Sequence, residues 1–290
     1  MALGTYWGAV LQLPALLVAA LLVAWPVAWV VYLSFRDMYL LRSFYESTFV
    51  GLRNYARLAA SPDFRSFVWH TGLWVVGTVA GELAVGMAAA LLLNRPGRLV
   101  GVCRGVLLIP WVVPPVVAAV VWRWLLDGQW GVINRLLLAT GIVRAPVLWL
   151  GDPVAVWPTL IAVTVWKAFP FAFVNFLAAL QGIPSEVVEA AQVDGATPVQ
   201  VLRHITLPLV YPVVKVVTLL LVIWRSNEFN MIWVMTQGGP GNVTMTLAPA
   251  IYSMAFQFYR VSLACAAGVA LMLVLLLLVG SYVRQVRGEG

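Results

Sequence analysis

Residues 261–283 read VSLACAAGVALMLVLLLLVGSYV and contain no charged side chain. The hydrocarbon core of a bilayer is about 30 Å thick, and an α-helix crosses it with about 20 residues. Backbone N–H and C=O groups find no water there, so they must pair within the segment, which favours a helix. We therefore interpret this stretch as a membrane-spanning helix.

Five further stretches share this length and apolar character. The stretch 13–35 is also free of charge, whereas the other four carry one to three charged residues each. Together they predict an all-α integral membrane protein with six transmembrane helices in a single domain over residues 1–290, with both termini on one side of the membrane. The predicted spans are 13–35, 67–93, 105–126, 153–180, 212–235 and 261–283.

The composition agrees with a membrane protein and excludes several other classes. Of the 290 residues, 62% are hydrophobic and 10% are charged, against about 25% charged in an average soluble domain. The net charge is +7, but the basic residues are scattered singly, so we expect no nucleic-acid partner. The predicted layout separates the two cysteines from each other and the two histidines from each other, so we predict no disulfide, no metal site and no cofactor. These residues are Cys103, Cys265, His70 and His204.

The stretch 181–211 is polar and punctuated by glycine and proline. It predicts two short helices along the membrane surface. Pro184 suits the first position of the first helix, and Gly195 supplies a left-handed residue that ends it. Thr197 followed by Pro198 then suits the start of a second helix, which we expect to run until Pro208 and Pro212 lead into the fifth span.

This stretch also resembles a known family. EAAQVDGA at 189–196, followed by ITLP at 205–208, is similar to the EAA loop in the permease subunits of binding-protein-dependent ABC importers. Other stretches are similar to the sugar-permease branch, which includes maltose, trehalose and glycerol-phosphate permeases: FVGLRNY at 49–55, IPWVVPPVVAAVVWRW at 109–124, GVIN at 131–134, WLGDP at 149–153, VWKAFPF at 165–171 and TQGGPGN at 236–242.

The resemblance implies a type I ABC importer permease fold in the bacterial inner membrane, with both termini cytoplasmic. It implies that the chain is not an enzyme but half of a carbohydrate translocation pathway. The implied partners are a second, homologous permease in a heterodimer, an ABC ATPase dimer, an extracytoplasmic sugar-binding protein, the lipid membrane and the sugar. The chain has no phosphate-binding loop of its own, because Lys167 and Lys215 do not follow glycines at the required spacing.

In this family the EAA loop is cytoplasmic and docks on the ATPase as a coupling helix. Small residues let a partner approach the backbone, and acidic residues can fix the register through charge-assisted hydrogen bonds. An ordinary amphipathic hairpin between two spans is the alternative interpretation. The predicted coupling residues are Glu189, Ala190, Ala191, Asp194, Gly195 and Ala196.

Several charged residues fall inside the predicted spans, where an unpaired charge costs about 2.5 to 3.5 kcal/mol. Arg225 and Glu228 share a helical face and can pair with each other, or they can serve a transported sugar. The stretch 223–233 resembles the cavity-lining span of maltose-type permeases, although that family usually shows Phe-Asp at Phe229-Asn230. For mid-span Glu82, beside small residues, a structural bond between helices is at least as good an interpretation as a role in transport, and Glu82 is left out of the site. The predicted substrate-pathway residues are Lys167, Asn175, Arg225, Asn227 and Glu228.

The loops assigned to the outer side carry two further expectations. The resemblance implies that the binding protein docks on 36–66 and on the TQGGPGN turn. On residue type alone, TQGGPGN is also an ordinary Gly/Pro turn. The segment 127–152 predicts a short surface helix, because its apolar residues recur at helical spacing.

Alternating access about kinks near Pro114 and Pro170 is the expected mechanism. The alternative function is an ATP-independent secondary transporter or channel. A membrane enzyme ranks last, since no catalytic motif is present.

Overall fold

The computed structural model describes residues 12, 14, 16–41 and 47–288. Leu13, where the first predicted span begins, and residues 42–46 of the predicted outer segment lie outside the described residues. Within the described part, strands are limited to an antiparallel pair, β1 (Arg36–Asp37) and β2 (Thr48–Phe49). The rest of the regular structure is helical, which confirms the all-α class.

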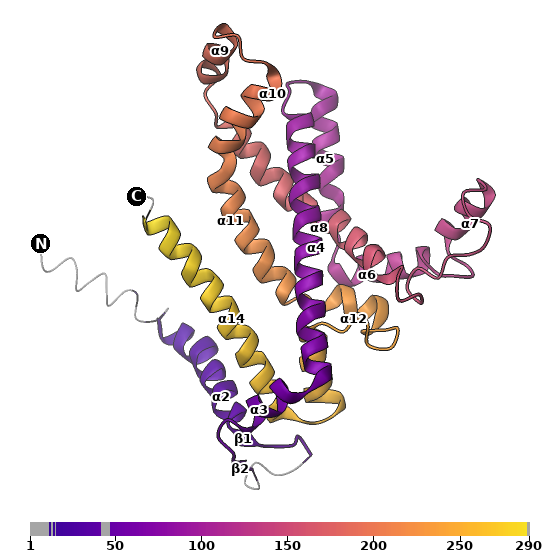
Figure 1. The fold of residues 1–290 in the computed structure, drawn as a ribbon, viewed down its shortest axis with the longest axis vertical. Helices are drawn as coiled ribbons and strands as arrows, with labels where there is room; N and C mark the ends of the chain where they lie inside the picture. Colours follow the sequence, from indigo (N-terminus) through magenta and orange to yellow (C-terminus); the bar gives the residue numbers. More distant parts are fainter. Residues whose placement is uncertain (1–11, 13, 15, 42–46, 289–290) are drawn as a thin grey trace, which may run out of the picture. The chain divides into compact units, whose positions relative to one another are not determined.

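Figure 1 shows the helices in their order along the chain. Three of the segments, labelled η, are π-helical turns. The elements are η1 (Ala20–Ala24), α2 (Trp25–Ser34), α3 (Arg53–Ala60), α4 (Pro62–Leu93), α5 (Arg98–Val112), α6 (Pro115–Leu125), α7 (Val132–Ala139), α8 (Val156–Gln181), α9 (Ser185–Val193), α10 (Pro198–Val201), η3 (Leu202–Thr206), α11 (Leu207–Ser226), α12 (Asn230–Thr236), α13 (Leu247–Tyr252), η4 (Ser253–Gln257) and α14 (Val261–Gly288).

Five helices of the described part are long and apolar enough to cross a membrane. They are Leu16–Ser34, Pro62–Leu93, Val156–Gln181, Pro198–Ser226 and Val261–Gln285. A sixth span exists only if α5 and α6 are counted together, since they meet at a bend of 94°.

The bend between α5 and α6 follows from two consecutive prolines. A residue before proline is pushed out of the helical region. Val113 precedes Pro114, which precedes Pro115, and both Val113 and Pro114 are extended, with ψ of 129° and 138°. The predicted kink at Pro114 is therefore present as a sharp turn. By contrast, α8 runs through Pro170 without a break.

The fifth predicted span differs from the structure in its course. The second short helix was expected to give way to the fifth span at Pro208 and Pro212, but one helix continues from Pro198 to Ser226. That expectation is wrong because the π-helical turn η3 precedes Pro208, and such a turn shifts the hydrogen-bond pattern where proline lacks an N–H. The helix then breaks at 227–229, before α12 begins.

The described residues divide into two compact units. The first is built from residues within 1–66 and 250–290, and in it α2 and α14 lie side by side (Figure 1). Asn54 is buried on α3, and its amide donates to the carbonyls of Ser34 at 2.8 Å and Arg36 at 2.6 Å. These bonds hold α3 against the end of α2.

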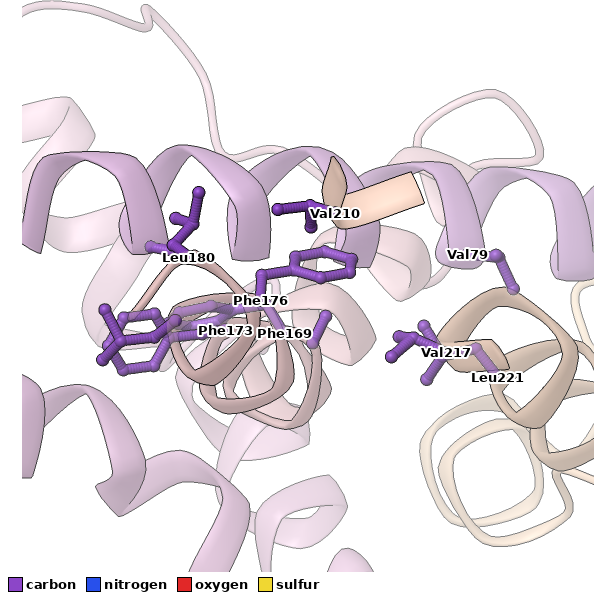
Figure 2. Close-up of a cluster of buried hydrophobic side chains, with 11 residues drawn as sticks. Val79, Phe169, Phe173, Phe176, Leu180, Val210, Val217 and Leu221 are labelled. Carbon is purple, nitrogen blue, oxygen red and sulfur yellow. The ribbon is translucent and has the colours of Figure 1, made fainter. Parts of the chain in front are cut away.

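The second unit covers 67–249 and contains the larger core. Three aromatic residues of α8, Phe169, Phe173 and Phe176, are buried in this cluster together with aliphatic residues of α4 and α11 (Figure 2). Gly86 brings α4 close to α8, because a Cβ there would lie 2.7 Å from the Cβ of Ala172. Small residues at such contacts are typical of membrane helix packing.

Candidate functional site

A cavity of about 90 Å³ lies within the second unit, where α8 faces the end of α11 and the α5–α6 bend. The lining residues come from α5, α6, α8, α11, the 227–229 break and α12. They are Trp111, Pro115, Thr164, Lys167, Ala168, Phe171, Leu221, Trp224, Arg225, Glu228 and Met231.

Arg225 is the centre of a charge network beside the cavity. Its Nη1 donates to Oε2 of Glu228 at 2.8 Å, and its Nε lies 3.1 Å from Oε1 of Glu82 without the angle of a hydrogen bond. The backbone N–H of Met231 donates to the second oxygen of Glu228 at 3.3 Å. The network thus joins α4 to α11 and to the first turn of α12, so it spans the break at 227–229.

Glu82 is the residue that the sequence interpretation left out of the site. Its side chain is fully buried, and neither carboxylate oxygen has a hydrogen bond. Its charge is therefore compensated by Arg225, as a buried charge requires. The expected bond between helices is confirmed, but it reaches a residue of the cavity. The small neighbours of Glu82 signalled close helix packing, whereas its partner 143 positions away, at residue 225, has no local sequence signal.

Two polar groups of α8 face the cavity without a hydrogen-bond partner in the described part of the chain. The hydroxyl of Thr164 is buried and makes no hydrogen bond. The ammonium of Lys167, one helical turn further, makes no hydrogen bond or ion pair within contact distance but interacts electrostatically with Arg225 and Glu228. Sequence reasoning missed Thr164, although its spacing of three from Lys167 places both on one helical face.

Aromatic rings form the apolar wall of the cavity. The rings of Phe171 and Trp224 have centroids 4.7 Å apart, and those of Trp111 and Phe171 are 6.1 Å apart. Faces of this kind can stack on the C–H surfaces of a sugar ring. The sequence interpretation did not single out these rings, because aromatic residues are frequent throughout this chain.

The predicted substrate-pathway residues are only partly brought together. Lys167, Arg225 and Glu228 line the cavity. Asn175 donates to the carbonyl of Phe171 at 2.7 Å within its own helix, and exposed Asn227 donates to that of Ile223 at 2.8 Å. Neither asparagine belongs to the cavity lining.

The predicted coupling segment forms α9 and the turn after it. Pro184 occupies the N-cap and not the first helical position that was predicted. Gly195 is left-handed, with φ of +85°, as expected. The N–H of Ala196 donates to the carbonyl of Ala191 at 2.9 Å, and that of Gly195 to the carbonyl of Gln192 at 3.0 Å. This is the Schellman motif, which satisfies the last carbonyls of the helix.

The exposed face of this segment is small and acidic. Glu189, Ala190, Asp194 and Gly195 are exposed, whereas Ala191 is buried and Ala196 is half-buried. A Cβ at Gly195 would meet nothing within 4 Å. The segment restarts at Thr197, whose side chain and that of Gln200 form a capping box.

The predicted surface helix within 127–152 is present as α7. Asn134 is buried there and binds the surrounding loop, accepting from the indole N–H of Trp149 at 3.0 Å and donating to the carbonyl of Val147 at 3.0 Å. The backbone N–H groups of Trp130 and Gln129 donate to Asp127 and hold the pKa of this carboxyl below its usual value. Among the described residues, no three His, Cys, Asp or Glu side chains lie close enough to hold a metal ion.

Comparisons with known proteins agree with this architecture. A probable ABC transporter permease protein of Brucella suis is 34% identical over 277 residues, which cover 94% of each chain. The trehalose/maltose transport system permease protein MalF of Thermococcus litoralis is 35% identical over 87% of this chain and 83% of its own.

A solved structure shares the fold at lower identity. It is a bacterial ABC transporter involved in the import of the acidic polysaccharide alginate, with a TM-score of 0.83 and 22% identity over 97% of this chain and 95% of its own. The profile of the binding-protein-dependent transport system inner membrane components matches residues 82–287. The chain therefore belongs to the family of binding-protein-dependent transport system inner membrane components.

Proposed function

We propose that this chain is the permease subunit of an ATP-driven, binding-protein-dependent carbohydrate importer. The cavity carries the proposal, because it combines hydrogen-bonding side chains with an aromatic wall inside a membrane bundle of this family. The similarity to a trehalose/maltose permease supports a carbohydrate as the substrate.

The chain forms half of the pathway in this proposal. A second, homologous permease completes it as a heterodimer, a separate ATPase dimer hydrolyses ATP, and an extracytoplasmic sugar-binding protein delivers the sugar. The chain lies in the bacterial inner membrane with both termini cytoplasmic. The outer segment 36–66 and the turn at 236–242 receive the binding protein.

The α9 segment is the contact with the ATPase. Its exposed small residues leave the backbone open to a partner, and Glu189 and Asp194 offer acceptors for charge-assisted hydrogen bonds. The segment continues through the capping box at Thr197 into the helix Pro198–Ser226. The last turn of this helix carries Arg225, which lines the cavity. A push on α9 therefore reaches the cavity along one continuous helix.

Two irregular points beside the cavity mark where the bundle can bend. They are the turn of 94° between α5 and α6 and the break at 227–229. Both border the cavity, so a change at either point opens or closes it. Alternating access then requires that ATP binding favours one of two packings of these helices.

Replacing Glu228 by alanine tests the cavity directly. The change removes the acceptor of Arg225 and of the Met231 N–H. We expect sugar uptake by the whole importer to fall while the permease still co-purifies with its ATPase. Unaltered uptake would exclude this face from the pathway, and activity without any ATPase would favour the secondary transporter or channel.

A further inference from the structure

The charges around the cavity balance one another. Glu82 and Glu228 flank a single guanidinium, that of Arg225, so these three groups carry one excess negative charge. Lys167, which faces the same cavity, supplies the compensating positive charge. The four side chains together are neutral when all are ionised.

The hydrogen-bonding groups of the cavity are not balanced in the same way. Both oxygens of Glu228 already accept, one from Arg225 and the other from the Met231 N–H. The hydroxyl of Thr164 and the ammonium of Lys167 have no acceptor among the described residues. The cavity therefore offers free donors and needs a ligand that accepts hydrogen bonds.

On the basis of the proposed function, we propose that the cavity selects an uncharged polyhydroxylated sugar over an acidic one, and that Glu82 sets this selectivity without touching the sugar. Hydroxyl oxygens of a neutral sugar accept from Lys167 and Thr164 and leave the network neutral. A carboxylate would accept as well, but it would add an uncompensated negative charge to this balanced network.

Similarity to known proteins does not decide between these sugar classes. The chain resembles a trehalose/maltose permease in sequence and an importer of an acidic polysaccharide in fold. The selectivity therefore depends on side chains of this chain. Glu82 pairs with Arg225 but does not line the cavity, so replacing it changes the net charge of the network without changing the side chains that line the cavity.

The test uses the complete permease and ATPase complex in nanodiscs, without the binding protein, so that only the permease selects. Equilibrium binding is measured for maltose and trehalose and for the same sugars carrying one carboxylate in place of a primary alcohol. The wild type is compared with Glu82→Gln, Lys167→Gln and the double variant. The glutamine at 82 keeps the shape of the side chain and removes its charge.

The wild type should bind the neutral sugars more tightly than their carboxylates. Glu82→Gln leaves one positive charge and should weaken this preference about a hundredfold, the order expected of one unit charge about 6 Å away at an effective dielectric constant of about 20. Lys167→Gln should strengthen the preference, and the double variant should return it toward that of the wild type.

An unchanged preference in Glu82→Gln, or a double variant that does not return toward the wild type, would overturn the charge-balance proposal. If Glu82→Gln fails to assemble with the ATPase, Lys167→Gln alone decides, since it leaves the buried ion pair intact. A wild type that binds neither class overturns the proposed cavity as well. A wild type that prefers the carboxylates overturns the selectivity alone.

Discussion

The cavity and the α9 segment differ in how the residues of each proposed site are held. Around the cavity, Arg225 is locked by two carboxylates, and one of them, Glu82, is fully buried. On α9, Glu189 and Asp194 are exposed, and the backbone is fixed by local hydrogen bonds around Gly195. The first region is built by contacts between distant helices, whereas the second is built by neighbours along the chain. Substitutions around the cavity should therefore lower stability, whereas substitutions in the α9 segment should mainly affect coupling.

Replacing Arg225 by alanine should have the largest effect on stability. It leaves the carboxylate of Glu82 buried without a counter-charge, and breaking a buried pair in this way typically costs about 3 to 5 kcal/mol. We expect a large drop in the unfolding temperature of the detergent-solubilised permease. Adding Glu82→Gln to Arg225→Ala should recover part of the loss. Equal stability of the single and double variants would contradict the pairing.

Replacing Gly86 by alanine should have an intermediate effect. The new Cβ would lie 2.7 Å from the Cβ of Ala172 and 3.0 Å from the backbone nitrogen of Phe173, so α4 and α8 must move apart. Overpacking of this kind costs about 1 to 3 kcal/mol. Gly72→Ala, on the same helix with nothing within 4 Å, is the matched control and should be neutral or slightly stabilising. Similar thermal unfolding of both variants would argue against the close contact between the helices.

Replacing Gly195 by valine should have the smallest effect on stability and a specific effect on coupling. Its φ of +85° is unfavourable for a β-branched residue, with a strain of about 1 to 2 kcal/mol, but the site is open. Gly141→Val carries similar strain at φ +71°, also in open space. Both variants should unfold at similar temperatures. Only Gly195→Val should reduce the amount of sugar taken up per ATP hydrolysed, and equal coupling in both variants would remove the role assigned to α9.

The same contrast explains what could be predicted from the sequence. The apolar runs located four long helices close to their bounds, because the bilayer imposes length and composition on each helix separately. The predicted spans 105–126 and 212–235 differ, because the first contains the bend of 94° and the second contains the break at 227–229. The turn at Gly195 and the cap at Thr197 were readable because they depend on neighbouring residues.

Features that depend on contacts between helices were not readable in this way. The ion pair of Glu82 with Arg225, the orientation of Thr164 toward the cavity and the position of Asn175 away from it follow from how α4, α8 and α11 pack. Spacing places Thr164 on the helical face of Lys167, but neither spacing nor composition encodes which helix that face meets. The course through Pro208 was mispredicted for a different reason, because the π-helical turn before it has no clear sequence signature.

The central claim is that a separate ATPase, acting through α9, drives a sugar through the cavity beside Arg225. Its most direct test is sugar uptake into proteoliposomes that contain both permeases and the binding protein, with and without the ATPase subunits. We predict uptake that requires both the ATPase and ATP hydrolysis. Full uptake without the ATPase would contradict the claim.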